Sequence, residues 1–277
     1  MQLKGIKCIT FKMTEYIFEA RTVQTSNVRS LFELLGSVIT DCNIIVTHDS
    51  IKIVELNNTQ VALIHVKLDA SGFEDYNFNP DELDKPLILG IHTDNFLKII
   101  KTIKHDETLS FFVKRAEPHY LYIRKENNIR NSTNSFKIAL HSIKHQNYTL
   151  PAADFNVVIS MSSAELQRIC KNFSSLGAST IEIKNIGEGV FLSGVGDFCS
   201  FEGVVGNSVE TTFENTSDEV IQGIFDIKYL LLFSKASSIS KTVNLYLKND
   251  YPLIMSYKIG TLGEMKFIVS AIEAKPT

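Results

Sequence analysis

Residues 162–173, SSAELQRICKNF, have the pattern of a short amphipathic helix. Ser162 with Glu165 three positions later matches a capping box, in which the two side chains bond each other's backbone N–H groups. Arg168 and Lys171 fall on one face of this helix. The apolar residues recur at helical spacing on the opposite face: Leu166, Ile169, Cys170 and Phe173. The stretch therefore predicts a helix that is buried on one side and basic on the other.

Three other stretches repeat this pattern at nearly even intervals, at residues 26–39, 94–104 and 226–236. Ser26, Asp94, Ser162 and Asp226 are the expected N-caps of the four helices. An apolar stripe must pack against something, and strands are the neighbours available in the sequence. The polar faces of the helices carry these cations: Arg29, Lys98, Lys101, Lys104, Arg168, Lys171, Lys228 and Lys235.

Runs of alternating apolar and polar residues lie between the predicted helices. They include residues 64–68, 136–140, 181–184 and 243–248. Alternation with period two is typical of strands in antiparallel sheets that have one packed and one solvated face. The pattern predicts an α+β fold in which one unit, a helix plus several strands, occurs four times.

The middle of the chain interrupts this repeat. Residues 141–154, HSIKHQNYTLPAAD, are polar and contain Pro151, and a new strand begins near residue 157. We therefore expect four segments: an extension at 1–17, a first domain at 18–140, a linker at 141–156 and a second domain at 157–277.

Composition places the chain among globular proteins. It has 277 residues, of which 44% are hydrophobic and 21% charged, and its formal net charge is −3. That charge argues against a simple basic nucleic-acid binder, unless the cations are gathered on one face. The four cysteines form no CxxC pair, and no apolar run is long enough to span a membrane. Without a signal-peptide core at the N-terminus, the prediction is an intracellular protein with free thiols.

Several segments, taken in order, resemble the sliding-clamp family that includes proliferating cell nuclear antigen. The resemblance extends over residues 18–272 without large gaps. The segments that carry it are FEAR at 18–21, VQ at 23–24, SGF at 71–73 with Tyr76, LQRICK at 166–171, YL at 229–230, FSKA at 233–236, PL at 252–253, YKI at 257–259, Gly263 and MKF at 265–267.

This resemblance implies two domains of one topology and three subunits joined head to tail in a closed ring. Helices would line the hole and antiparallel sheets would form the outside. The implied activity is to encircle duplex DNA, independently of its sequence, and to tether DNA polymerase and other replication or repair enzymes. A clamp loader is an implied partner, no cofactor is expected, and the implied location is the nucleus or another site of DNA replication.

The eight helix cations are the candidate DNA-binding residues. Mobile cations that contact phosphates alone would hold a duplex without reading its bases. The alternative is that they are ordinary solvated helix faces. Ser30 and Gly36 occupy positions where relatives often have lysine, so we expect a smaller contribution from the first helix.

A groove for partner peptides is the second site that the resemblance implies. Relatives bind a short motif with an apolar and an aromatic side chain beneath the linker. The alternative is that the apolar linker residues only attach the linker to the core. The matching positions are Leu56, Val61, Leu63, Tyr148, Leu150, Pro151, Phe155, Pro252, Ile268 and Val269. Thr149 and Ser270 differ from the residues common in relatives, which leaves the peptide preference open.

Subunits would join by strand addition at sheet edges. The expected contacts are Phe136 and Ile138 on one edge, and Cys199 and Phe201 on the other.

No motif of an enzyme or a metal site is present. The chain has no HExxH and no GxxxxGK[ST], and His141 and His145 lie in the linker. We therefore predict that it is not an enzyme and has no metal site. Three alternatives to a homotrimeric ring are a subunit of a heterotrimeric clamp, a monomeric processivity factor with one basic face, and an enzyme of unrecognised type.

Overall fold

The computed structural model describes residues 15–80, 85–127, 129–144, 146, 148, 153–185, 187, 189–216 and 219–272. The first half of the chain consists of β1 (Tyr16–Thr22), α1 (Thr25–Gly36), β2 (Asp41–Val46), β3 (Ser50–Leu56), β4 (Ala62–Asp69), the 3₁₀ helix η1 (Ala70–Gly72), β5 (Asp75–Phe78), β6 (Leu87–His92), α2 (Thr93–Ile100), β7 (Thr108–Lys114), β8 (Tyr120–Asn127) and β9 (Ser132–Ala139).

The second half repeats the first half's order of strands and α-helices. It consists of β10 (Val157–Ser162), α3 (Ser163–Ser175), β11 (Thr180–Asn185), β12 (Gly189–Val195), β13 (Ser200–Gly206), β14 (Thr212–Asn215), β15 (Gln222–Asp226), α4 (Ile227–Phe233), the 3₁₀ helix η2 (Ser234–Ser238), β16 (Thr242–Leu247), β17 (Leu253–Ile259) and β18 (Gly263–Val269). The fourfold repeat expected from the periodicity is thus present, with two helices in each half.

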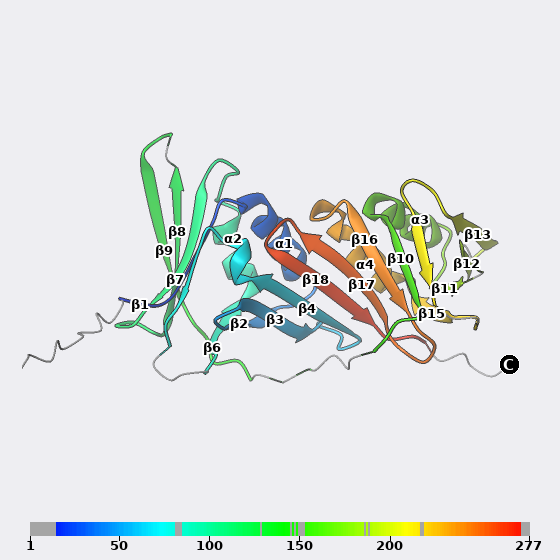
Figure 1. Cartoon of the computed structure of the whole chain (residues 1–277), viewed down its shortest axis with the longest axis horizontal. Helices are drawn as coiled ribbons and strands as arrows, with labels where there is room; N and C mark the ends of the chain where they lie inside the picture. The colour runs from blue at the N-terminus through cyan, green and yellow to red at the C-terminus, as the bar shows by residue number, and fades with distance from the viewer. Residues whose placement is uncertain are drawn as a thin grey trace, which may run out of the picture.

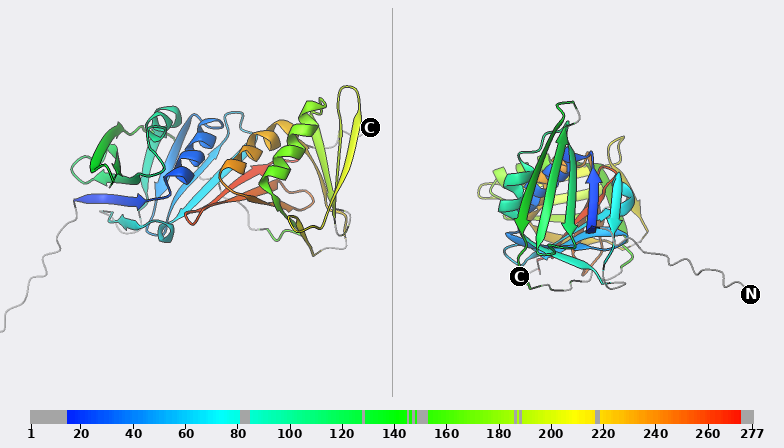
Figure 2. Two further views of the ribbon diagram at one scale, coloured as in Figure 1. Left: turned by 90° about the horizontal axis from the view of Figure 1, so that it is seen from above. Right: turned by 90° about the vertical axis from the view of Figure 1, so that its left-hand side faces the viewer.

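Three antiparallel sheets carry these helices. The central sheet has nine strands in the order β14-β10-β16-β17-β18-β4-β3-β2-β6, and β18 pairs with β4 to join the two halves. A five-stranded sheet, β5-β1-β7-β8-β9, lies at one end of the molecule, and a four-stranded sheet, β13-β12-β11-β15, lies at the other (Figure 1). All four α-helices lie on the same face of the central sheet, as the view from above shows (Figure 2).

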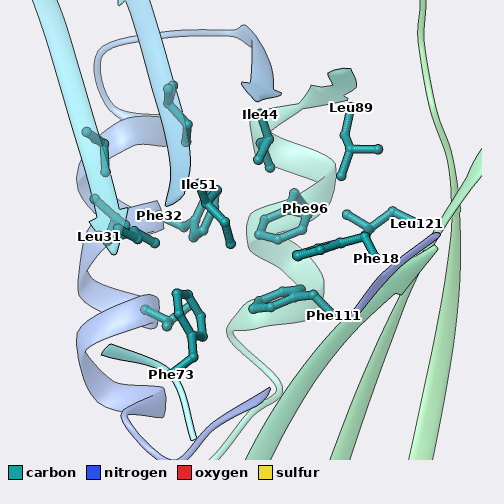
Figure 3. A pocket seen from close by; sticks show the side chains of 14 residues that line it. Phe18, Leu31, Phe32, Ile44, Ile51, Phe73, Leu89, Phe96, Phe111 and Leu121 are labelled. Atoms are coloured by element: carbon teal, nitrogen blue, oxygen red, sulfur yellow. The ribbon is translucent and has the colours of Figure 1, made fainter. Parts of the chain in front are cut away.

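One continuous hydrophobic core fills the space between helices and sheets. In the first half it includes Phe32 and Phe96, whose ring centroids lie 4.4 Å apart between α1 and α2. A cavity of about 40 Å³ remains beside these rings, and its lining side chains are apolar (Figure 3). Since ligand sites usually measure about 300 Å³ or more, this cavity is a packing defect of the core.

Two of the four predicted N-caps are correct. Ser162 precedes α3 and Asp226 precedes α4, where the Asp226 carboxylate accepts a hydrogen bond from the Lys228 amide at 2.8 Å. Gln24 and His92 replace the predicted Ser26 and Asp94. Tertiary contacts explain the earlier start of α2, because the Thr93 hydroxyl donates to the Ile39 and Thr40 carbonyl oxygens.

The predicted capping box of α3 is wrong. Ser162 makes no side-chain capping bond, and Glu165 accepts two hydrogen bonds from Arg168 instead. Three helix ends also differ from the prediction, and the first is that of α1, which ends at Gly36 and not at residue 39. Helix α2 ends at Ile100, and α4 ends at Phe233 before the chain continues as η2.

The expected extension is two residues too long at its C-terminal end. Tyr16 and Ile17 belong to β1, and Ile17 is buried in the core. None of the helices that the structure describes is both long and apolar enough to cross a membrane.

Candidate nucleic-acid interface and docking surfaces

The eight predicted cations all lie at exposed positions on or next to the four helices. Lys101 and Lys104 follow the end of α2, and Lys235 lies in η2. Helix α1 packs against α2, α3 against α4, and α1 also contacts η2. The fold therefore brings helices that are far apart in the sequence, and that carry these cations, onto one face of the central sheet (Figure 2).

The two arginines of this face have carboxylate partners. Arg29 binds Glu33 at 3.0 Å, and Arg168 donates to both carboxylate oxygens of Glu165 at 2.8 and 2.6 Å. The Arg168 hydrogen bond lowers the pKa of Glu165. Because exposed ion pairs of this kind contribute only about 0–1 kcal/mol, a phosphate can compete for either arginine.

A hollow of about 360 Å³ opens between the start of α1 and the end of α2. Arg29, Lys101, Lys104 and His105 contribute its basic lining. His105 was not among the eight predicted cations. The basic run KTIKH at 101–105 was the sequence feature that could have indicated it.

An apolar row crosses the face of the central sheet opposite the helices. Strand register aligns its members side by side on five strands: Leu56, Leu63, Ile268, Ile254 and Tyr246. Three of these were predicted groove residues. Ile254 and Tyr246 were not among the predicted groove residues, although they are apolar residues at outward positions of strands 253–259 and 242–247.

Val269 was wrongly assigned to the groove. It is fully buried, because residues alternate between faces along β18 and Val269 points to the helix side. Ile268, its neighbour, points outward, although only 8% of its surface is exposed. Val61 lies just before β4 and is 42% exposed.

Residues of the linker approach the same face. The Phe155 ring contacts Tyr246 at 5.5 Å and Tyr251 at 5.8 Å between centroids. Tyr148 is half-buried, whereas Leu150 and Pro151 lie outside the described residues. Pro252 borders a hollow of about 530 Å³ that also includes Gly223, Ser270 and Ala271.

The start of the linker is attached to an edge strand. The His141 amide donates to the Gly90 carbonyl oxygen of β6 at 2.9 Å. A Cβ atom at Gly90 would collide with the His141 carbonyl oxygen. This contact holds the first residue of the linker at the edge of the central sheet.

Strands β9 and β13 are the outermost strands at opposite ends of the molecule (Figure 1). Phe136 and Ile138 are half-buried in β9, and Phe201 is half-buried in β13. Cys199 lies just before β13. Phe198 and Val204 are exposed apolar residues near the second edge that were not among the predicted contacts. A hollow of about 220 Å³ lies between α3 and β13.

Within the described ranges, no three His, Cys, Asp or Glu residues are grouped so that they could hold a metal ion. Cys42, Cys170 and Cys199 are free thiols. Burial raises the pKa of Cys170 to about 12, so this thiol stays protonated at neutral pH.

Family models and relatives match the chain along nearly its whole length. The model for proliferating cell nuclear antigen, N-terminal domain, matches residues 17–148, and the C-terminal domain model matches residues 149–272. Proliferating cell nuclear antigen of Dictyostelium discoideum is 30% identical over 262 residues, covering 92% of this chain and 98% of the relative. A probable DNA polymerase sliding clamp of Paramecium bursaria Chlorella virus 1 is 29% identical over 259 residues, covering 92% and 97%.

A solved structure has the same fold. The crystal structure of proliferating cellular nuclear antigen from Entamoeba histolytica matches with a TM-score of 0.83 and 24% identity. The match covers 93% of this chain and 100% of the other.

Proposed function

Because the chain belongs to the proliferating cell nuclear antigen family, we propose that it is a DNA sliding clamp. Three copies form a ring that encircles duplex DNA and tethers DNA polymerase, which raises processivity. The clamp is a scaffold and not an enzyme, as is the rule in this family.

One observation carries this proposal: two halves of like topology present four helices, with their cations, on a single face. In a closed ring that face becomes the inner wall. The eight predicted cations and His105 then contact phosphates, which gives binding without base recognition.

The sheet edges support ring closure. Strands β9 and β13 lie at opposite ends of one chain, so pairing β9 of one copy with β13 of the next is a heterologous contact. Repetition of such a contact closes a ring when the rotation between copies fits. Phe136, Ile138 and Phe201, with Cys199 beside them, supply the apolar part of this interface.

Partner proteins bind the face of the central sheet opposite the helices. An apolar peptide segment seats on the apolar row next to Val61, Tyr148, Phe155 and Pro252, with Leu150 and Pro151 as further proposed contacts. DNA polymerase, other clamp-binding proteins and a clamp loader are the partners of this surface.

The domain limits that we propose follow the same division. They are a first domain to residue 140, a linker at 141–156 and a second domain from 157. The role requires an intracellular site of DNA replication, of which the nucleus is one.

Solution mass, measured by light scattering on a sizing column, tests the ring. The expected species has three times the chain mass of 31.1 kDa. A species of one chain mass would instead favour a heterotrimeric clamp or a monomeric factor. A loading assay on circular DNA follows: the ring should stay on closed circles and slide off after linearisation.

A further inference from the structure

The apolar row has a basic neighbour on the same face of the central sheet. Two residues along each strand from the apolar row, strand register aligns a second row on β3, β4, β18 and β17: Val54, His65, Lys266 and Ser256. Residues two positions apart along a strand lie about 7 Å apart. Lys266 is therefore the cation next to Ile268, and His65 is next to Leu63.

A second basic row follows. It aligns Lys52, Lys67, Glu264 and Lys258 on the same four strands. We call Lys52, Lys67 and Lys266 the cationic strip. The strip lies on the face opposite the helices, so it is separate from the proposed DNA-facing cations.

On the side of the first basic row, the carboxylates lie beyond that row, whereas Glu182 and Asp250 line the hollow that Pro252 borders. Lys266 pairs with Glu264 at 2.7 Å, and Lys67 pairs with Asp69 at 2.7 Å. Asp49 lies in the turn between β2 and β3. The row nearest the apolar residues thus has one lysine, Lys266, and no carboxylate, although the whole chain has a net charge of −3.

The pKa of His65 supports a positive local potential. Burial lowers the pKa of His65 first, and the charges of Lys266, Lys52 and Lys67 lower it further against the opposing effect of Glu264. Cations thus dominate the charges around the imidazole.

We propose that the peptide bound at the apolar row carries one or two carboxylates beside its apolar plug, and that Lys266 and Lys52 recognise them. This inference rests on the proposed docking function. An acidic peptide fits better than nucleic acid because the strip adjoins an apolar row, which phosphates would leave unused. The carboxylates follow the plug within two to three residues, since an extended chain covers about 7 Å in two residues.

Two fluorescent peptides test this preference. Both have the same length and the same plug of one aliphatic and one aromatic side chain. One has aspartate at the second and third positions from the plug, and the other has asparagine there. Anisotropy titration of the full chain at low salt should show the aspartate peptide binding about five- to tenfold tighter, the scale of one or two partly exposed ion pairs.

The variant chain combines Lys52→Gln and Lys266→Gln. It should bind the aspartate peptide only as well as the asparagine peptide, whose affinity should not change and so reports that the variant is folded. The matched control is Lys241→Gln, an exposed lysine between η2 and β16, which should keep the full preference. Salt at about 0.5 M should reduce the preference of the unaltered chain.

Three outcomes would overturn the inference. Equal binding of both peptides to the unaltered chain would remove the acidic preference and leave the groove in place. Binding of neither peptide would remove the groove as well, and with it that part of the proposed function. Weaker duplex-DNA binding by the double variant, with the peptide preference intact, would assign the strip to nucleic acid.

Discussion

At the residue scale, His65 makes the stability of the fold depend on pH. Its folded-state pKa lies below the ordinary 6.5, because burial and the lysines around it disfavour the charged form. The unfolded chain therefore binds more protons, and stability falls as the pH is lowered through 6.5 until the folded pKa is reached. His65→Gln should flatten this fall, measured as the urea midpoint across a pH series. His119→Gln, at an exposed position, is the control and should leave the fall unchanged. Parallel curves of urea midpoint against pH for His65→Gln and the parent would contradict the expectation.

At the scale of elements, α2 and the residues after it make the densest group of proposed phosphate contacts. Lys98→Gln with Lys101→Gln and Lys104→Gln should weaken duplex-DNA binding similarly for every sequence. The slope of log K against log salt should fall by about one for each phosphate that the variant no longer binds. Lys184→Gln on β11, away from the helices, is the control. A slope unchanged from that of the parent would mean that these lysines are only a solvated face.

At the scale of the whole molecule, the edges of the two outer sheets decide assembly. Phe201→Asp in β13 would place a charge in the proposed apolar contact with the next copy. The expected result is a shift of solution mass from three chains to one chain of 31.1 kDa, with the far-ultraviolet dichroism retained. Val220→Asp, at an exposed apolar position outside β13, should stay trimeric. A trimeric Phe201→Asp chain would place the interface elsewhere.

Local pattern in the sequence was sufficient for several features. Helical spacing placed four amphipathic helices, and alternation placed β4, β11 and β16 with the correct buried faces. Residue type located two caps, of which Asp226 makes the expected side-chain hydrogen bond and Ser162 makes none. These features depend on neighbours within a few residues. They can be read from the sequence because side chains on one face recur with the period of a helix or a strand.

Other features depend on segments far apart in the chain. Thr93 and Gln24 set the starts of two helices through tertiary contacts, which overrode the preference of nearby Asp94 and Ser26. The pairing of Ile268 with Leu63 joins the two halves and creates the apolar row. Because Ile268 faces outward in this register, its neighbour Val269 faces the core. Periodicity by itself thus determined the four helices and the alternating strands. The tertiary structure alone decided which strands are neighbours, because pairing between distant segments leaves no local pattern, and that pairing places Lys266 beside the row.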